Sequence, residues 1–286
     1  MDNIIRLALP TGRIQSNFFK LLTDAGIEIK NSARSYRPTL SILDFDTKIL
    51  KTQNIVEMLM LGKRDIGVAG LDWVGELNAD LVELLDTELD PVKIVAAAPE
   101  GFPNANQYQN RRLIVATEYT NIAKTWIQQS GLNAEVVRSF GTTEAFPPED
   151  ADCIIDNTAT GATLEASNLK VIDTVLTSST RVYANPEALD NPEKRQKIED
   201  FILILKSVLD ARNKVMVEVN VTKENLESVA GILPCMKMPT ISELFNGAGF
   251  VVKVAVPKIQ LPMLIPKIKQ TGGTDIVVTT LSNVIP

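Results

Sequence analysis

The chain has 286 residues, of which 45% are hydrophobic and 22% charged, and its formal net charge at pH 7 is −6. This length and composition predict a globular protein with a full core, divided into two or three units. The mixed, slightly acidic charge argues against nucleic acid or an anionic membrane as the main partner. The sequence contains no histidine, which excludes an imidazole base, a serine–histidine or cysteine–histidine pair and a histidine-ligated zinc.

The N-terminal residues enter a strand pattern at once and do not form an export signal, and no apolar run reaches the roughly 18 to 20 residues that span a membrane. We therefore expect a cytoplasmic protein. Cys153 and Cys235 are the only cysteines, and they show no metal-ligand spacing. Both are expected to be ordinary packed thiols.

From Ile4 to about Leu176 short apolar runs alternate with helical patterns, which is typical of a mostly parallel sheet with helices on its faces. The predicted elements are strands at 4–9, 65–69, 92–98, 113–116, 135–138 and 153–155, helices at 14–25, 55–61 and 121–130, and a long extended segment at 171–183. The later strands form a second series, so we expect two lobes with a ligand-binding cleft at their hinge.

A helix is predicted within residues 191–214, and after it the order strand, helix, strand, strand, helix, strand extends to residue 281. This order is the ferredoxin-like plan, here ACT-like. The predicted fold class is α/β, with a two-lobed, periplasmic-binding-protein-like body and a C-terminal ferredoxin-like domain. The expected divisions are lobe one at 1–95 and 177–212, lobe two at 96–176, and the C-terminal domain at 213–286.

The segment from Asp152 to Leu164 has the pattern of a phosphate site, because an apolar strand runs through Asp156 into a turn rich in threonine. Backbone N–H groups, threonine hydroxyls and the start of a helix can all point at one anion there, and Gly161 permits close approach. In the alternative reading, the threonines are only turn formers and helix caps.

Four segments in this order resemble ATP phosphoribosyltransferase: Ala8 to Arg13, Asp65 to Asp72, Val115 to Tyr119, and Asp156 to Leu164. The resemblance covers the whole chain and is most specific at the last segment. Val217 to Val221, Leu233-Pro234 and Met238 to Thr240 resemble the C-terminal domain of the long form of this family, which carries its own regulatory domain.

The resemblance implies the first step of histidine synthesis, in which N1 of ATP displaces pyrophosphate from C1 of phosphoribosyl pyrophosphate. It also implies Mg²⁺ as cofactor, histidine as inhibitor at the C-terminal domain, and a homo-oligomer, either a hexamer or a dimer. Since such a reaction needs placement and charge stabilisation more than a nucleophile, the lack of histidine is no obstacle. The Mg²⁺ would be held largely by pyrophosphate oxygens and water, and its protein ligands stay unassigned.

The site residues follow from the same resemblance. Asp156 is the catalytic candidate, and the allosteric candidates are Glu218 and Thr240. The candidates for binding phosphoribosyl pyrophosphate or ATP are Arg13, Lys51, Asp72, Tyr119, Glu144, Asn157, Thr158, Ala159, Thr160, Gly161, Ala162 and Thr163. By its position alone Arg13 could be a solvated turn residue, and Asp72 could be a helix cap.

Three departures from the family keep a second hypothesis open. Thr11 stands where the family usually has lysine, and Lys51 begins a loop where it usually has arginine, which loses the bidentate geometry. Glu149-Asp150 replaces a usual glycine, and the segment from Glu144 to Asp156 is one residue short. The alternative function is a non-catalytic small-molecule-binding or regulatory protein with an amino-acid-sensing C-terminal domain. A Rossmann dehydrogenase is disfavoured, because no G-x-G-x-x-G follows a strand.

Overall fold

The computed structural model describes residues 3–30, 36–102, 111–234 and 238–285, so Cys235 lies outside the described residues. The chain divides into two compact units, residues 1–20 with 27–199 and residues 21–26 with 200–286. In the part of the chain that the structure describes, no helix is both long and apolar enough to cross a membrane.

The first unit is built on an eight-stranded sheet in the order β4-β1-β5-β10-β6-β9-β7-β8. The strands are β1 (Ile5–Pro10), β4 (Phe45–Leu50), β5 (Ile66–Gly70), β6 (Val82–Pro99), β7 (Leu113–Thr117), β8 (Ala134–Arg138), β9 (Cys153–Thr158) and β10 (Leu169–Ala184). The helices are α1 (Arg13–Asp24), α2 (Thr52–Met60), α3 (Leu71–Glu76), α4 (Thr120–Ser130), α5 (Ala162–Ala166) and α6 (Pro192–Arg212), which ends in the second unit. A small hairpin joins β2 (Ile29–Lys30) and β3 (Thr39–Leu40).

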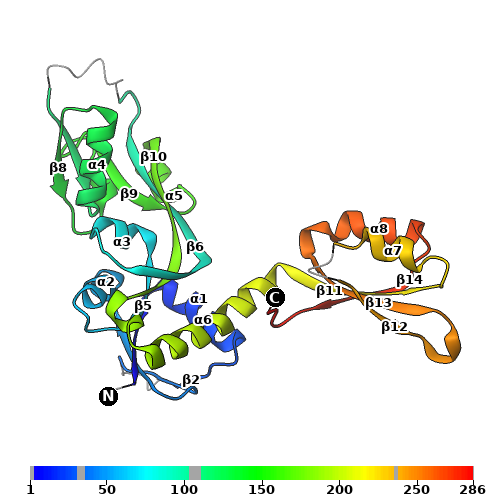
Figure 1. Cartoon of the computed structure of the whole chain (residues 1–286). Helices are drawn as coiled ribbons and strands as arrows, with labels where there is room; N and C mark the ends of the chain where they lie inside the picture. The colour runs from blue at the N-terminus through cyan, green and yellow to red at the C-terminus, as the bar shows by residue number, and fades with distance from the viewer. Residues whose placement is uncertain (1–2, 31–35, 103–110, 235–237, 286) are drawn as a thin grey trace. The chain divides into compact units, whose positions relative to one another are not determined.

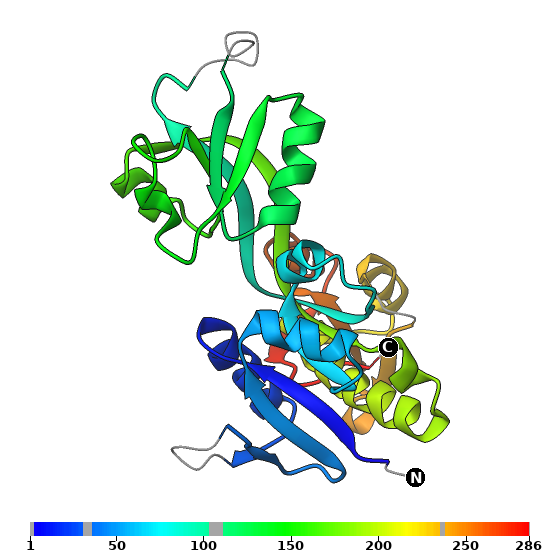
Figure 2. The same ribbon diagram turned by 90° about the vertical axis from the view of Figure 1, so that its left-hand side faces the viewer.

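The sheet is parallel at both ends and antiparallel in the middle. β1 pairs in parallel with β4 and β5, and β7 pairs in parallel with β8 and β9. The long strands β6 and β10 pair antiparallel with each other and with the neighbouring strands β9 and β5. Figure 2 shows β1 and β4 side by side in blue, and the two long strands β6, in cyan, and β10, in yellow-green, running up from the same end of the sheet toward the green strands β7, β8 and β9. The expectation of a mostly parallel sheet is therefore correct for the three strands at each end of the sheet and wrong for the pairings of β6 and β10 in its middle.

The strand that leads into the predicted phosphate turn is buried on both faces. Ile155 packs with Val115 and Trp126 on one face, while Ile154 packs with Leu164 on the other. Burial on both faces explains why the strand reads as a continuous apolar run instead of an alternating one.

The second unit has a four-stranded sheet in the order β12-β13-β11-β14. Its elements are β11 (Lys214–Val221), α7 (Leu226–Ile232), β12 (Thr240–Glu243), β13 (Phe250–Pro257), α8 (Leu261–Gln270) and β14 (Thr274–Thr280). Burial alternates strictly along β11, and its buried valines share a core with Val229, Leu264 and Ile268 of the helices. Figure 1 shows α7 and α8 on one face of this sheet. The predicted α/β class with a C-terminal ferredoxin-like domain is confirmed.

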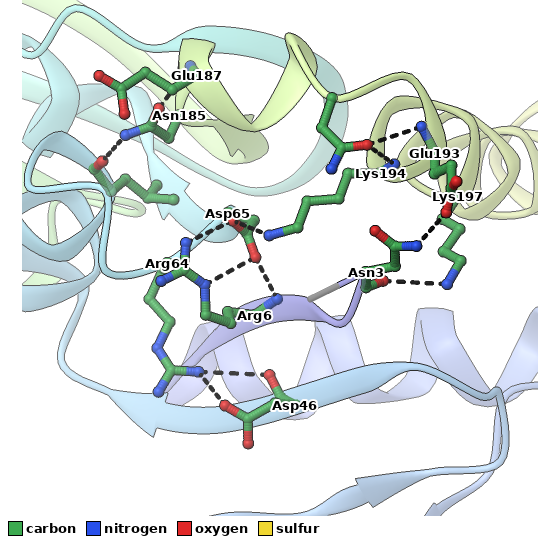
Figure 3. A network of polar contacts seen from close by, with 12 residues as sticks. Asn3, Arg6, Asp46, Arg64, Asp65, Asn185, Glu187, Glu193, Lys194 and Lys197 are labelled. Atoms are coloured by element: carbon green, nitrogen blue, oxygen red, sulfur yellow. Dashed lines mark hydrogen bonds and ion pairs between the residues drawn. The ribbon is translucent and has the colours of Figure 1, made fainter. Parts of the chain in front are cut away.

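A polar network holds α6 to the sheet where β1 and β5 begin (Figure 3). Arg6 donates through Nε and Nη2 to the two carboxylate oxygens of Asp65, at 3.0 and 2.7 Å, and Lys194 of α6 donates to the same group at 3.0 Å. Burial opposes ionisation of Asp65, but the hydrogen bonds from Arg6 and Lys194 outweigh it and lower its pKa. The hollow beside this network, about 360 Å³, lies at the amino edge of the sheet, whereas α/β folds bind ligands at the carboxyl edge.

Candidate active site

The turn after β9 is shaped by Gly161 and Thr158. Gly161 has φ +85° and is the N-cap of α5. A Cβ atom there would meet nothing within 4 Å, so the backbone conformation is what requires glycine. Thr158 Oγ1 accepts a hydrogen bond of 2.9 Å from the Gly161 N–H, which makes Thr158 a turn former. Ala159, Thr160, Ala162 and Thr163 are exposed around the turn.

Asp156 lies in β9, two residues before the strand ends. Burial raises its pKa to about 6; the Asn157 N–H opposes the rise by a hydrogen bond of 2.7 Å, and the charges of Glu144 and Glu118 add to it. A hydrogen bond with the Thr143 side chain also lowers the pKa. The predicted residues Glu144 and Asp156 are therefore electrostatic neighbours, although they come from different elements.

A chain of hydrogen bonds connects Asp156 with α3. Asn157 Nδ2 donates to Asp156 at 3.3 Å and to the Tyr119 hydroxyl at 3.2 Å, and that hydroxyl donates to Asp72 Oδ2 at 3.0 Å. Tyr119 is 2% exposed, and its pKa is raised by burial and by the charge of Asp72. Four residues predicted from the sequence thus form one continuous network.

Asp72 is fixed from its other side by Ser178 of β10. The Ser178 hydroxyl donates to Asp72 Oδ1 at 2.7 Å and accepts from the Asp72 N–H at 3.1 Å. The helix-cap alternative for Asp72 is wrong, because Gly70 is the N-cap of α3 and Asp72 lies within the first turn of the helix. A Cβ atom on Gly70 would lie 2.1 Å from Asp72 Oδ1, so this carboxylate fits only beside glycine.

A cavity of about 160 Å³ opens beside this network. Four of the predicted substrate-binding residues line it: Arg13, Asp72, Tyr119 and Asn157. The lining residues that sequence reasoning missed are Ile14, Thr52, Gly70, Trp73, Asp90, Val92, Ser178, Ser179 and Thr180. The run of hydroxyl side chains from Thr177 to Thr180 inside a long extended segment was a signal that could have found three of them.

Arg13 is the first residue of α1 and is 59% exposed. Its Nε lies 3.6 Å from Asp90 Oδ1. Lys51 is the exposed N-cap of α2 and does not line the cavity, although its neighbour Thr52 does. Residues 158–163 and Glu144 also lie outside the cavity lining; the turn directly follows Asn157, which does line the cavity.

The two allosteric candidates lie in the second unit on one face of its sheet. Lys253 of β13 is the register partner of Glu218 on β11 and of Thr240 on β12. Residues directly opposite each other share a face of a sheet, and Lys253 Nζ lies 2.9 Å from the Glu218 carboxylate. The neighbouring residues Val217 and Val219 are buried in the core with the helices, so these three side chains lie on the other face.

The fold and site define an α/β protein with a threonine-rich turn at the carboxyl end of β9 and a cavity lined by polar side chains near it. A family model described as ATP phosphoribosyltransferase matches residues 51–207, and one described as HisG, C-terminal domain, matches residues 211–283.

Curated relatives match over nearly the full length. An ATP phosphoribosyltransferase of Pelotomaculum thermopropionicum is 35% identical and covers 99% of each chain, and one of Thermodesulfovibrio yellowstonii is 35% identical over 100% of this chain and 99% of the relative. A solved ATP phosphoribosyl transferase (HisG:HisZ) complex from Thermotoga maritima has a TM-score of 0.64 at 24% identity, over 72% of this chain and 99% of that chain, and so shares its fold.

The chain therefore belongs to the ATP phosphoribosyltransferase family. Its activity is that of a pentosyltransferase of histidine biosynthesis, in the long form with a C-terminal domain. The non-catalytic alternative is not supported.

Proposed function

We propose that the turn 158–163 binds the 5′-phosphate of phosphoribosyl pyrophosphate and that the neighbouring cavity completes the site. The observation that carries the proposal is the hydrogen-bond network that runs from Asp156 and Asn157, which directly precede the turn, through Tyr119 to Asp72. The threonine hydroxyls, and the backbone N–H groups of the turn other than that of Gly161, supply donors for phosphate oxygens. Arg13, at the cavity wall, supplies a planar fork for the pyrophosphate.

The reaction joins N1 of the ATP adenine to C1 of the ribose while pyrophosphate leaves. Positive charge develops on the ribose ring as the bond to pyrophosphate breaks, so a fixed negative group nearby lowers the barrier. Asp156, once ionised, is placed to do this or to accept hydrogen bonds from ribose hydroxyls. The rigid network behind it holds its carboxylate in one orientation, which contributes through placement of the reactants.

Mg²⁺ is the proposed cofactor. The carboxylates of Asp156 and Glu144 are hard oxygen donors, close enough for the charge of one to raise the pKa of the other, and this donor chemistry fits the ion. Mg²⁺ would be shared between one or both of these carboxylates and the pyrophosphate oxygens, where it neutralises the charge of the leaving group.

We further propose a division of labour along the chain. Lobe one (1–95 and 177–212) and lobe two (96–176) carry catalysis, with Lys51 close to the site. The domain 213–286 binds histidine, with Glu218 and Thr240 in or near its pocket, as feedback inhibitor of a cytoplasmic homo-oligomer. The exposed face with Glu218, Lys253 and Thr240 offers both charges needed for an amino acid.

The experiment is pyrophosphate release by the purified chain with Mg²⁺, ATP and phosphoribosyl pyrophosphate. The expected result is release that requires both substrates, stops when Mg²⁺ is chelated and falls when histidine is added. Release from phosphoribosyl pyrophosphate alone would contradict the transfer reaction, and release indifferent to histidine would contradict the regulatory proposal.

A further inference from the structure

An unusual piece of backbone in β6 puts a carboxylate into the cavity wall. Glu88 and Asp90 have φ values of +56° and +49°, and the pairing of β6 with β10 shifts register on either side of Thr180. Non-glycine residues rarely adopt this conformation, and it persists only where the surroundings over-determine it. Asp90 lines the cavity, and its side chain is only 4% exposed.

Three groups converge on this carboxylate. Asn17 Nδ2 donates to Oδ1 at 2.6 Å, Thr180 Oγ1 donates to Oδ2 at 3.3 Å, and Arg13 Nε lies 3.6 Å from Oδ1. Asn17 and Thr180 donate to different oxygens of the carboxylate, so Asp90 keeps both hydrogen bonds when Arg13 binds a ligand. Because Arg13 and Asn17 are four residues apart on α1, they lie on the same face of the helix.

Among the residues that the structure describes, the Arg13 guanidinium pairs with a carboxylate at one edge only. The contact with Asp90 is through Nε, and a guanidinium has five N–H donors, so its terminal amino groups can still bind phosphate oxygens in a bidentate manner. Anchoring one edge reduces the rotamer freedom that the exposed side chain would lose when it binds a ligand. A carboxylate in this position therefore improves phosphate binding even though its charge is negative.

We propose that Asp90 is a positioning residue that acts through Arg13 on the pyrophosphate group of phosphoribosyl pyrophosphate. This inference rests on the proposed function, because it names the ligand of that same site. It accounts for a buried carboxylate on a strained backbone in the wall of a cavity that receives phosphates.

The test compares Asp90→Asn with Glu88→Gln in the full-length protein. Asparagine tolerates the positive φ, keeps an oxygen for Asn17 and places its NH2 group beside the Thr180 hydroxyl, which can accept instead of donate, while the charge that anchors Arg13 is removed. Glu88→Gln removes the same charge from an exposed side chain two residues away on the same kind of backbone. If Asp90→Asn does not fold, Asp90→Gly also fits this backbone and replaces it.

For Asp90→Asn we expect the KM and the calorimetric Kd for phosphoribosyl pyrophosphate to rise about threefold to tenfold, with kcat within about twofold of wild type. Glu88→Gln should leave all three values within about twofold. In an Arg13→Ala background the Asp90→Asn change should have no further effect, because the two residues act as one unit.

Unchanged or tighter binding by Asp90→Asn would overturn the inference, and so would an equal effect with and without Arg13. Wild-type protein in the same assays separates this failure from failure of the proposed function. A wild type that neither turns over nor binds phosphoribosyl pyrophosphate contradicts both, whereas an active wild type with an indifferent Asp90→Asn contradicts only the role of Asp90.

Discussion

The ionised carboxylate of Asp156 lowers the free energy of unfolding. Burial, reinforced by Glu144 and Glu118, raises its pKa from 3.8 to about 6, so the folded protein holds this proton more tightly than the unfolded chain does. Stability contributed by Asp156 is therefore greatest at low pH, falls as the pH rises from about 4 to 6, and stays reduced at neutral pH.

The first prediction concerns Asp156→Asn. At about pH 7.5 this change should raise the free energy of unfolding by about 1 to 2 kcal/mol, which is the pKa shift converted and reduced for solvent screening. At about pH 4 the gain should vanish, because Asp156 is then protonated in the folded protein. Turnover should be lost at both pH values, as the ionised carboxylate is absent.

Chemical denaturation at both pH values, together with a turnover assay, checks this prediction. Asp150→Asn is the matched control, since it removes a carboxylate from an exposed position in the same segment and should change neither quantity. An Asp156→Asn protein that is less stable than wild type at about pH 7.5 would show that the carboxylate is stabilised in the fold.

At the scale of the element, α3 is a short helix whose start is fixed by a distant strand. Ser178, 106 residues away, binds both the N–H and the carboxylate of Asp72, and Gly70 leaves room for that carboxylate. Gly70→Ala should displace Asp72 from Ser178 and Tyr119, lower the free energy of unfolding by about 1 to 3 kcal/mol and reduce turnover.

Gly75 lies in the same helix, but a Cβ atom there would meet nothing within 4 Å. Gly75→Ala should therefore be neutral or stabilising by up to about 1 kcal/mol, with turnover retained. Thermal or denaturant unfolding of the two variants tests the difference. Equal stabilities would mean that the Asp72 carboxylate moves aside at no cost.

The same elements show what the sequence could reveal. The helical periodicity of 121–130 and the apolar run 153–155 are local signals, and both elements form as predicted. The first half of β6 was missed because Asp86, Glu88 and Asp90-Pro91 have the chemistry of turns, and only pairing with β10 makes this stretch a strand. The pair of hydrogen bonds between Ser178 and Asp72 was missed for the same reason, since no local pattern encodes a contact between such distant residues.

At the scale of the whole molecule, the two units have separate cores, and the proposed effector site lies in the second unit whereas the candidate active site lies in the first. Coupling between two such sites is typically worth about 1 to 3 kcal/mol, and it can be lost without loss of either fold. Glu218 and Thr240 both belong to the second unit, where they share a face of the sheet with Lys253.

We predict that Glu218→Gln combined with Thr240→Ala raises the histidine concentration for half-inhibition by about tenfold or more, with uninhibited turnover unchanged. Glu227→Gln is the control, because Glu227 is exposed in the first turn of α7, on the helical side of the sheet. Inhibition curves for the three proteins provide the measurement. A double variant that is inhibited as strongly as wild type would place the effector elsewhere.

The central claim is that the turn after β9 binds phosphoribosyl pyrophosphate, and the most direct test is kcat/KM for that substrate in Gly161→Ala and Gly131→Ala. Both glycines have positive φ, +85° and +67°, and open space at Cβ, so both changes should cost about 1 kcal/mol of stability. Gly131 only ends α4, so its variant should keep wild-type kcat/KM. Gly161→Ala should lose at least about tenfold, because the strained turn no longer presents its N–H groups to the phosphate. Equal kcat/KM in the two variants would contradict the claim.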